Sequence, residues 1–312
     1  MRKTVLTAIV ALGTGAAVAF GAGPSTAQPK PATDPWVQIG SDIKSGVSGL
    51  TVTSRSGGTL HTLVVRDNKK PGENRIAEAT YRPGRTPEVS PISWRGGPEP
   101  VDLEAIDAVP GTSDEFVAVA SRGLAYHVKL ADAGEAVEVL DVAPLPAIGD
   151  GDDFESFSLT SRNGKLAALW ADRGAGKERP ATVYSAPFSF GSYGESEFGK
   201  VRKSVFRAPY PSGDVRHVSD IDVTKSGRVL ISSASDSGDD GPFDSAVSDA
   251  GKLSVTRAGA VRLSLAKSPE LLEKFKGHKI EALHCVPGSG RAALGTDDEN
   301  AGGSVTTSRL CA

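Results

Sequence analysis

A short motif of alternating apolar and small or acidic residues recurs five times along the chain. Its copies are Val47-Ser48-Gly49-Leu50, Leu103-Glu104-Ala105-Ile106, Phe154-Glu155-Ser156-Phe157, Val218-Ser219-Asp220-Ile221 and Ile280-Glu281-Ala282-Leu283. Alternation of this kind predicts a strand whose two faces differ. The copies follow one another at intervals of 51 to 64 residues, counted between residues 50, 106, 157, 221 and 283. A strand repeat at this spacing is typical of propeller blades, because one blade cannot bury its own faces.

The segments that follow each copy predict how the repeat closes. The first four copies each precede three more strand-like runs, separated by turns rich in Gly, Pro, Asp and Ser. The fifth precedes only Arg291–Gly295 and Ser304–Leu310 before the chain stops. The strand-like segment Trp36–Ile39 can supply the missing strand and so remove an exposed sheet edge. We therefore predict an all-β, five-bladed β-propeller whose N-terminal strand completes the last blade. A pair of β-sandwiches is the alternative, but it would leave the repeated motif unexplained.

One segment has the pattern of a helix. Ser268 can cap an N-terminus, Pro269 suits a first turn, and Leu271, Leu272 and Phe275 share a helical face. We therefore expect a helix over Ser268–Lys276.

The N-terminus has the features of an export signal. Met1-Arg2-Lys3 precedes an apolar run to Phe20, and small residues end at Ala27. We expect a signal peptide over residues 1–27, a flexible leader over 28–35 and a single propeller domain over 36–312. A retained membrane anchor is the alternative, although the apolar run is short and rich in Gly and Ala. The expected product is a secreted, extracellular monomer without a membrane segment after cleavage.

Charge and composition exclude one class of partner. The formal net charge is −3 at pH 7, so the chain has no basic field of the kind that nucleic acid requires. The 36 Gly and 20 Pro residues agree with many tight turns between short strands.

The two cysteines fit an oxidising compartment and predict a disulfide between Cys285 and Cys311. If they lay on the first and third strands of one blade, straight strands would hold them too far apart. The terminal Leu310-Cys311-Ala312 would then have to bend across the blade. Two buried thiols are the alternative.

The second residue of each motif contributes to the candidate site. In a propeller the first strand of every blade lines the central channel, so five equivalent residues should form a ring at one height. These residues are Ser48, Glu104, Glu155, Ser219 and Glu281. Three carboxylates that converge need protons, hydrogen bonds or a cation, and oxygen ligands of this type suit Ca²⁺. Alternatively, each glutamate only accepts backbone N–H groups from the neighbouring first strand.

This order of residues carries a family resemblance. Ser, Glu, Glu, Ser and Glu, one per blade, resemble the channel ring of calcium-activated nucleotidases of the apyrase type. The resemblance implies a Ca²⁺ ion in a five-bladed propeller and hydrolysis of nucleoside diphosphates at the channel mouth. The motifs Asp102–Ile106 and Asp153–Phe157 also look like those of secreted phytase-like and esterase-like propellers. The longer acidic motifs of β-propeller phytases are missing.

Loops after the second strands should open at the same mouth as the ring. Arg122 and Arg173 there could bind an anionic substrate, while Asp172 or Asp297 could orient a water molecule. The ring would hold the ion, which would stabilise developing charge. Asp and Arg at strand ends are also ordinary turn residues that bond to their own backbone.

Two further residues, His217 and His278, precede first strands and should approach this mouth. We count them with the arginines as candidate substrate-binding residues.

Two functional hypotheses follow. The first is a calcium-dependent secreted hydrolase of phosphate esters or related small anionic substrates. The second is a non-catalytic extracellular propeller that binds a protein or glycan partner. The fold cannot decide between them, because propellers serve both roles.

Overall fold

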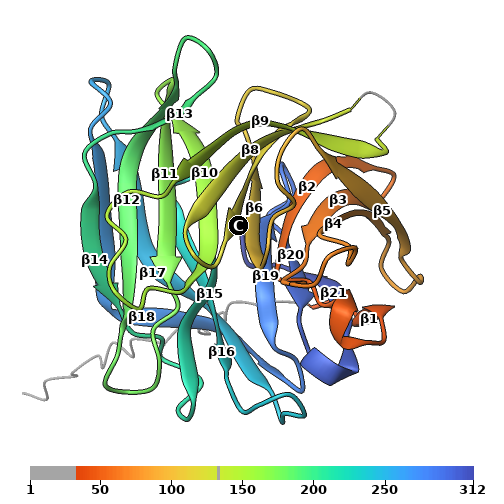
Figure 1. The fold of residues 1–312 in the computed structure, drawn as a ribbon. Coiled ribbons are helices and arrows are strands. Elements are labelled where there is room, and N and C mark those ends of the chain that lie inside the picture. Colours follow the sequence, from red (N-terminus) through yellow and green to blue (C-terminus); the bar gives the residue numbers. More distant parts are fainter. Residues whose placement is uncertain (1–32, 132–133) are drawn as a thin grey trace, which may run out of the picture. The chain divides into compact units, whose positions relative to one another are not determined.

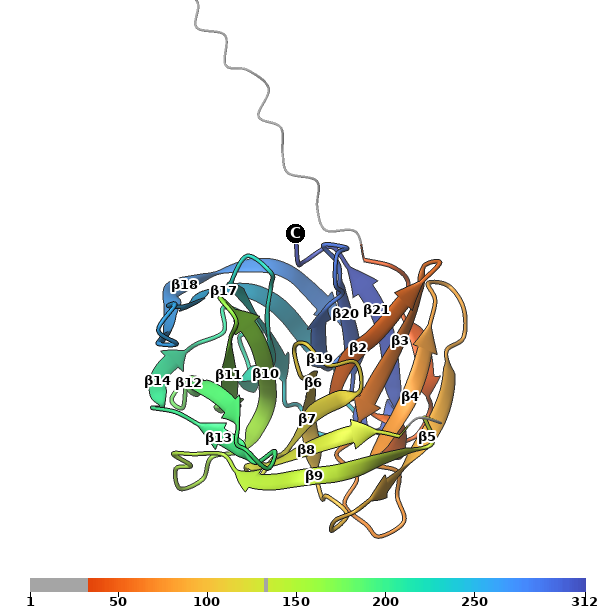
Figure 2. The ribbon, with the colours of Figure 1, turned by 90° about the horizontal axis from the view of Figure 1, so that it is seen from above.

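Five antiparallel sheets surround a common axis in the computed structural model, which describes residues 33–131 and 134–312 (Figure 1). The first strands of these blades contact one another in a closed cycle. They are β2 (Gly49–Ser56), β6 (Leu103–Ala108), β10 (Phe154–Arg162), β15 (Val215–Val223) and β19 (Ile280–Cys285). Figure 2 shows β2, β6, β10 and β19 near the centre, with β5, β9, β14 and β18 at the periphery. The predicted five-bladed propeller is confirmed.

The remaining strands follow the first strand outward in each of blades 1 to 4. They are β3 (Thr59–Val65), β4 (Ile76–Tyr81) and β5 (Glu88–Arg95) in blade 1; β7 (Glu115–Ala120), β8 (Leu124–Leu130) and β9 (Ala136–Pro144) in blade 2; β11 (Lys165–Asp172), β12 (Ala181–Phe190), β13 (Ser196–Phe198) and β14 (Arg202–Phe206) in blade 3; and β16 (Arg228–Ser235), β17 (Asp244–Val255) and β18 (Val261–Lys276) in blade 4. A short parallel pairing of β5 with β9 also joins the outer edges of blades 1 and 2.

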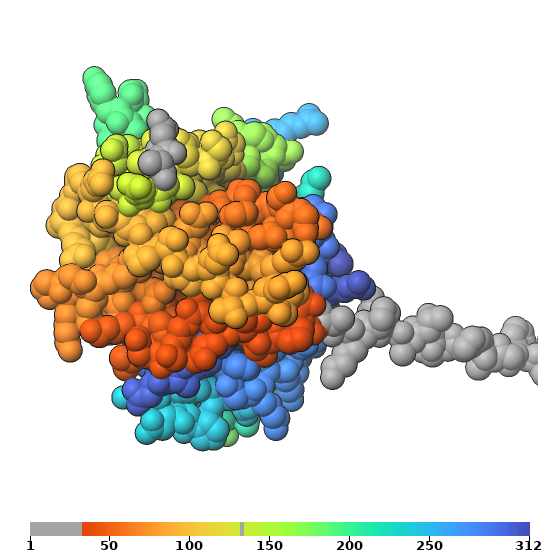
Figure 3. Space-filling model, turned by 90° about the vertical axis from the view of Figure 1, so that its right-hand side faces the viewer, coloured from red at the N-terminus to blue at the C-terminus, as the bar shows by residue number. Residues whose placement is uncertain are grey.

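Blade 5 contains both ends of the described chain. Strand β1 (Val37–Gly40) pairs with β21 (Gly303–Ser308), which is followed inward by β20 (Ala292–Thr296) and β19. This confirms the predicted closure by an N-terminal strand. Figure 3 shows the result on the surface, where blade 1 in red and orange lies between the blue chain of blade 5 and the yellow chain of blade 2.

Two residues of the predicted leader pair with a strand of blade 5. Thr33 forms a β-bridge with Ser308, and the Asp34 N–H donates to the Thr307 carbonyl. These two residues therefore belong to blade 5 rather than to a leader. The predicted signal peptide, residues 1–27, lies outside the described residues. Within the described part of the chain, no helix has the length and apolar character needed to cross a bilayer.

The helix expected over Ser268–Lys276 is a wrong prediction. This segment is the second half of β18, in which Phe275 pairs with Ser245 and Glu273 pairs with Val247 of β17. Phe275 is buried between blades 4 and 5, so pairing and packing outweigh the local helical pattern. Proline is tolerated at Pro269 because β18 is an outer strand.

Apolar side chains gather between neighbouring blades. Five clusters are found among the described residues, and each draws on two adjacent blades. The cluster between blades 2 and 3, for example, contains Phe154, Trp170 and Tyr184, with the Trp170 and Tyr184 rings stacked at 5.4 Å. The inner strands are buried on both faces, which holds them rigidly around the channel.

The disulfide between Cys285 and Cys311 is present, with a Cα–Cα distance of 5.7 Å. Cys311 lies beyond the end of β21, and its backbone N–H donates to the Gly290 carbonyl at 3.0 Å. The chain end therefore leaves the third strand and bends back toward β19, as the geometry requires. This bridge fixes the C-terminus at the channel end opposite the start of β19.

Candidate functional site

Three glutamates from three blades converge inside the channel. One carboxylate oxygen each of Glu104, Glu155 and Glu281 lies within 4.8 Å of those of the other two. Their residues are between 2% and 8% exposed, so the charges are largely removed from water. The predicted meeting of these residues around one axis is confirmed, and repulsion between them must be offset by protons or cations.

Each glutamate is the extra residue of a β-bulge. The register between first and second strands shifts between Leu103 and Ala105, between Phe154 and Ser156, and between Ile280 and Ala282. A bulge leaves one residue unpaired and redirects its side chain. The flanking apolar residues can thus pack between blades while the glutamates are directed into the channel.

The two serines predicted for the ring are buried, Ser48 directly before β2 of blade 1 and Ser219 in β15 of blade 4. The Ser48 hydroxyl accepts a hydrogen bond from the Asp67 N–H at 3.2 Å. The Ser219 hydroxyl is fully buried and has no hydrogen-bond partner among the described residues. A buried hydroxyl without a partner is costly, so Ser219 can donate to or ligate a bound group.

Two cations enter the ring that we did not predict. One Arg216 guanidinium nitrogen lies 2.8 Å from Glu281 Oε1 and 3.6 Å from Glu155 Oε2. Lys279 Nζ lies 2.9 Å from the same Glu281 Oε1 and also contacts Glu299. Burial opposes the charge of Arg216, but the carboxylates outweigh it and raise its pKa; the same balance raises the pKa of Lys279. Both cations therefore stay charged.

The three glutamates differ in the number of cations that they contact. Glu281 contacts Arg216 and Lys279, while Glu155 contacts Arg216 and, at 3.4 Å, Arg173. Within the described part of the chain, no Lys, Arg or His lies in ion-pair distance of Glu104. Burial and the neighbouring Glu155 and Glu281 raise the pKa of Glu104 well above its usual range. Burial also raises the pKa of Glu155 to about 7, although Arg216 lowers it.

Three aspartates accept backbone N–H groups from neighbouring first strands, the role considered above as the alternative for the glutamates. Asp107 accepts the Leu159 N–H at 2.8 Å, Asp220 accepts the Leu283 N–H at 2.7 Å, and Asp222 accepts the Cys285 N–H at 2.5 Å. Each bond joins the first strand of one blade to that of a neighbour. These aspartates hold the inner strands together, which leaves the glutamate carboxylates available for other contacts.

The predicted substrate-binding residues separate into two kinds. Arg173 lies at the ring, where it contacts both Glu155 and Asp153. Arg122 is exposed in a turn, and the described residues form no ion pair with it.

The two histidines have structural partners. His217 accepts the Ala208 N–H at Nδ1 and its Nε2 lies 2.7 Å from the Gly176 carbonyl, so both ring nitrogens are used. His278 Nδ1 lies 2.9 Å from Asp298, and its ring lies 4.3 Å from that of Trp36. Neither histidine contacts a ring glutamate.

The predicted catalytic aspartates also differ. The Asp172 carboxylate accepts the N–H groups of Asp153 and Gly174 and pairs with Arg179, so its oxygens are engaged in the loop. Asp297 is 2% exposed, and burial followed by the charge of Glu281 raises its pKa well above its usual range. Asp297 thus belongs to the electrostatic environment of the ring, whereas Asp172 serves its own loop.

Sequence reasoning missed Arg216 and Lys279 for different reasons. Lys279 stands two residues before Glu281, a spacing that places both on one face of a strand, so this signal was available. Arg216 stands three residues before Ser219 and should face the other way. The register of β15 shifts between Arg216 and Asp220, and this irregularity brings the guanidinium into the ring.

A cavity of about 690 Å³ lies at the opposite end of the channel, where the first strands end. It is lined by Asp107, Asp222, His284 and the disulfide. Because both aspartates already accept backbone N–H groups, this cavity is not the catalytic candidate.

The raised carboxyl pKa values predict that stability falls as pH rises. Burial raises the pKa of Asp67 and of Asp107 to about 6 and that of Glu155 to about 7. The folded state therefore binds protons that the unfolded chain has released, and it loses this advantage between about pH 4 and pH 7. In the presence of chelator we expect a melting temperature roughly 5–10 °C lower at pH 8 than at pH 5.

Two variants check this pH dependence by calorimetry or fluorescence. Asp67→Asn should flatten the profile because it removes one buried carboxyl group. Asp114→Asn, at a surface ion pair with Lys129, should leave the slope unchanged. A melting temperature that rises from pH 5 to pH 8 would contradict the raised pKa values of these buried carboxyl groups.

Comparisons with known proteins give a fold but no family. No protein-family model and no curated protein sequence matches the chain. The α-L-arabinofuranosidase of Podospora anserina, solved with cellotriose, aligns with 91% of this chain and 99% of its own at 10% identity and a TM-score of 0.50. At this identity the likeness shows the propeller fold alone.

Two other similar structures have lower TM-scores. A GH43 β-1,3-galactosidase aligns with 84% of this chain and 90% of its own, at 10% identity and a TM-score of 0.46. The GH43 protein BlXynB of Bacillus licheniformis aligns with 74% of this chain at 14% identity and a TM-score of 0.45, and this chain spans only 46% of its length. No matching family model or curated sequence supports the apyrase or phytase resemblance.

Proposed function

We propose that this protein is an exported hydrolase that cleaves glycosidic bonds with the carboxyl groups of the channel ring. One observation carries this proposal. Glu281 contacts two cations and Glu104 contacts none among the described residues, although a carboxylate oxygen of each lies within 4.8 Å of the other. Glycoside hydrolysis needs one carboxyl group that gives a proton and one that stays a carboxylate. The similar structures include a protein named as an α-L-arabinofuranosidase, which agrees with this chemistry.

The distribution of cations supports these roles. Arg173, Arg216 and Lys279 contact the ring, but they pair only with Glu155 and Glu281. Glu104 lacks a cation among the described residues, so its negative charge stays unpaired. A proton on Glu104 removes this charge, so Glu104 is the proposed general acid.

Glu281 is the proposed nucleophile. Both of its cations contact Oε1, which leaves Oε2 free to attack the anomeric carbon. The bond from that carbon to the leaving oxygen breaks as Glu104 protonates the oxygen, and a glycosyl ester of Glu281 forms. Glu104 then takes a proton from water, which attacks the same carbon and releases Glu281. Carboxyl groups within about 5 Å favour this retaining route, because inverting enzymes need a wider gap for water.

A calcium-dependent hydrolase of phosphate esters is the second candidate. The unpaired negative charge, the unpartnered Ser219 hydroxyl and the nearby acids Asp67 and Asp297 form an oxygen-rich set that fits Ca²⁺. Glu104, Glu155 and Glu281 would hold the ion with Ser48 and Ser219. The ion would supply Lewis-acid stabilisation of a phosphoryl group near Arg173.

A substrate screen distinguishes the candidates. Pure protein is assayed on nitrophenyl arabinofuranosides, xylosides, galactosides and phosphate, each with calcium and with chelator. We expect turnover of a glycoside that persists in chelator, with retention of anomeric configuration seen by NMR. Calcium-dependent turnover of the phosphate alone would favour the second candidate. If no substrate is hydrolysed, the non-catalytic binding propeller becomes the better account.

A further inference from the structure

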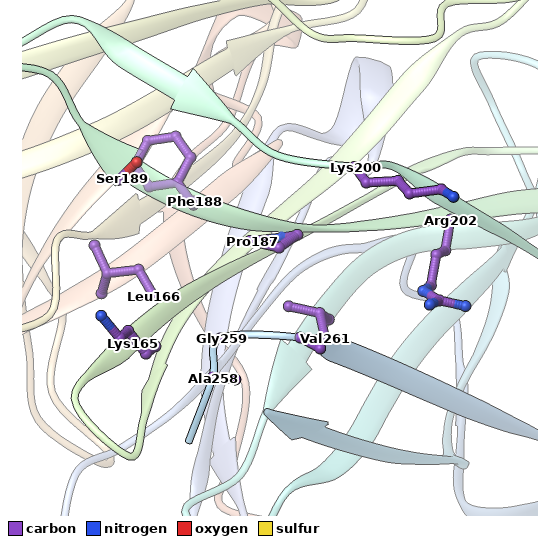
Figure 4. A pocket seen from close by; sticks show the side chains of 11 residues that line it. Lys165, Leu166, Pro187, Phe188, Ser189, Lys200, Arg202, Ala258, Gly259 and Val261 are labelled. Atoms are coloured by element: carbon purple, nitrogen blue, oxygen red, sulfur yellow. The ribbon is translucent and has the colours of Figure 1, made fainter. Parts of the chain in front are cut away.

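A groove of about 490 Å³ lies between blades 3 and 4, away from the acid ring (Figure 4). Strands β11 and β12 and the start of β14 form one side of it. The turn between β17 and β18, with Gly259 and Val261, forms the other. The Asn163 amide donates to the Val255 carbonyl at 2.8 Å and fixes this turn against blade 3. The two walls are therefore held in place by the fold.

The charge of this groove is opposite to that of the whole chain. Lys165, Lys200 and Arg202 line it, and its lining contains no Asp or Glu. All three cations are exposed, and none of them forms an ion pair with a described residue. In a chain of net charge −3, a concave surface with three unpaired cations attracts anions.

The arrangement of these side chains indicates an extended ligand. Figure 4 shows Lys165 near one end of the groove and Lys200 with Arg202 toward the other, with Pro187 and Val261 between them. A small anion could contact only one end. A polymer with repeated anionic groups could contact both ends while its less polar face lies on the apolar middle.

We propose that this groove binds an anionic polysaccharide chain. Sugar rings offer apolar C–H faces for the half-buried Pro187 and the exposed Ala260, and their carboxylate or sulfate groups would pair with Lys165, Lys200 and Arg202. The three cations attract the charge, and the apolar middle selects a chain of rings over a flexible acidic peptide. The groove would bind its ligand independently of the acid ring, so it does not depend on the proposed hydrolase activity.

Affinity electrophoresis with matched polymers tests this site. Carboxymethyl cellulose should retard the protein, whereas hydroxyethyl cellulose, with the same backbone but no charge, should not. A comparison of dextran sulfate with uncharged dextran shows whether the groove also binds sulfate groups. Sodium chloride at high concentration should weaken binding, because exposed charges are screened. Absence of retardation by both charged polymers would overturn the proposal, and so would equal retardation by poly-L-glutamate.

Variants locate the binding surface. Lys165→Glu, Lys200→Glu and Arg202→Glu together should weaken binding by at least about tenfold. The matched control reverses three exposed cations of blade 1, as Lys70→Glu, Arg82→Glu and Arg85→Glu, and should keep most of the affinity. Equal loss in both triple variants would mean that net charge alone acts, which excludes the groove. Glu281→Gln should bind the polymer normally, so failure of the catalytic proposal would leave this result intact.

Discussion

Arg216→Met is expected to destabilise the folded protein by about 3–5 kcal/mol near pH 8. The guanidinium is shared by Glu155 and Glu281, and the three side chains are between 3% and 13% exposed. Methionine keeps much of the side-chain volume but leaves both carboxylates buried with less positive charge. The cost should appear in denaturant unfolding as a lower midpoint with an unchanged slope.

The same variant has a distinctive pH signature. Lowering the pH to about 5 should restore much of the lost stability, because protons can replace the missing guanidinium on the glutamates. Arg228→Met is the matched control. Its ion pair with Asp249 is about a third exposed at the arginine, so the expected cost is below about 1 kcal/mol. If Arg216→Met had the same melting temperature as the parent protein at pH 8, the ring would be hydrated rather than buried.

Loss of the Glu281 carboxylate is expected to lower kcat on the best glycoside by about 10²–10⁴-fold. The variant Glu281→Gly removes the nucleophile and opens space beside the anomeric carbon. Added azide should then restore turnover and give a glycosyl azide of inverted configuration, because the small anion attacks where Glu281 Oε2 lies. Such rescue would not occur if Glu281 had only a structural role.

Glu104 has a different expected signature. Glu104→Gln should strongly slow substrates with poor leaving groups and spare those with acidic phenols, which leave without a proton. Asp236→Asn, at the partly exposed rim beside Arg216, is the control and should change kcat little. If Glu104→Gln cleaved both kinds of substrate at the parent rate, the assignment of the general acid would be wrong.

The repeated motif alone determined much of the architecture. Five copies at similar spacing predicted five blades, and the shortage of one strand after the fifth copy predicted closure by Trp36–Ile39. The same motif predicted that Glu104, Glu155 and Glu281 meet, since equivalent positions of equivalent strands share one height. These inferences succeed because a propeller is built from copies, so sequence periodicity maps directly onto spatial symmetry.

Tertiary structure decided what local patterns could not. The segment Ser268–Lys276 has a helical pattern, yet pairing with β17 makes it a strand. The β-bulges determine which side chains enter the channel, and one irregularity in β15 turns Arg216 toward the glutamates. The charge balance of the ring, and thus the difference between Glu104 and Glu281, depends on contacts between blades about 60 residues apart in sequence. Such contacts exist only when the blades are assembled, because burial and neighbouring charges rather than residue type set the state of each carboxyl group.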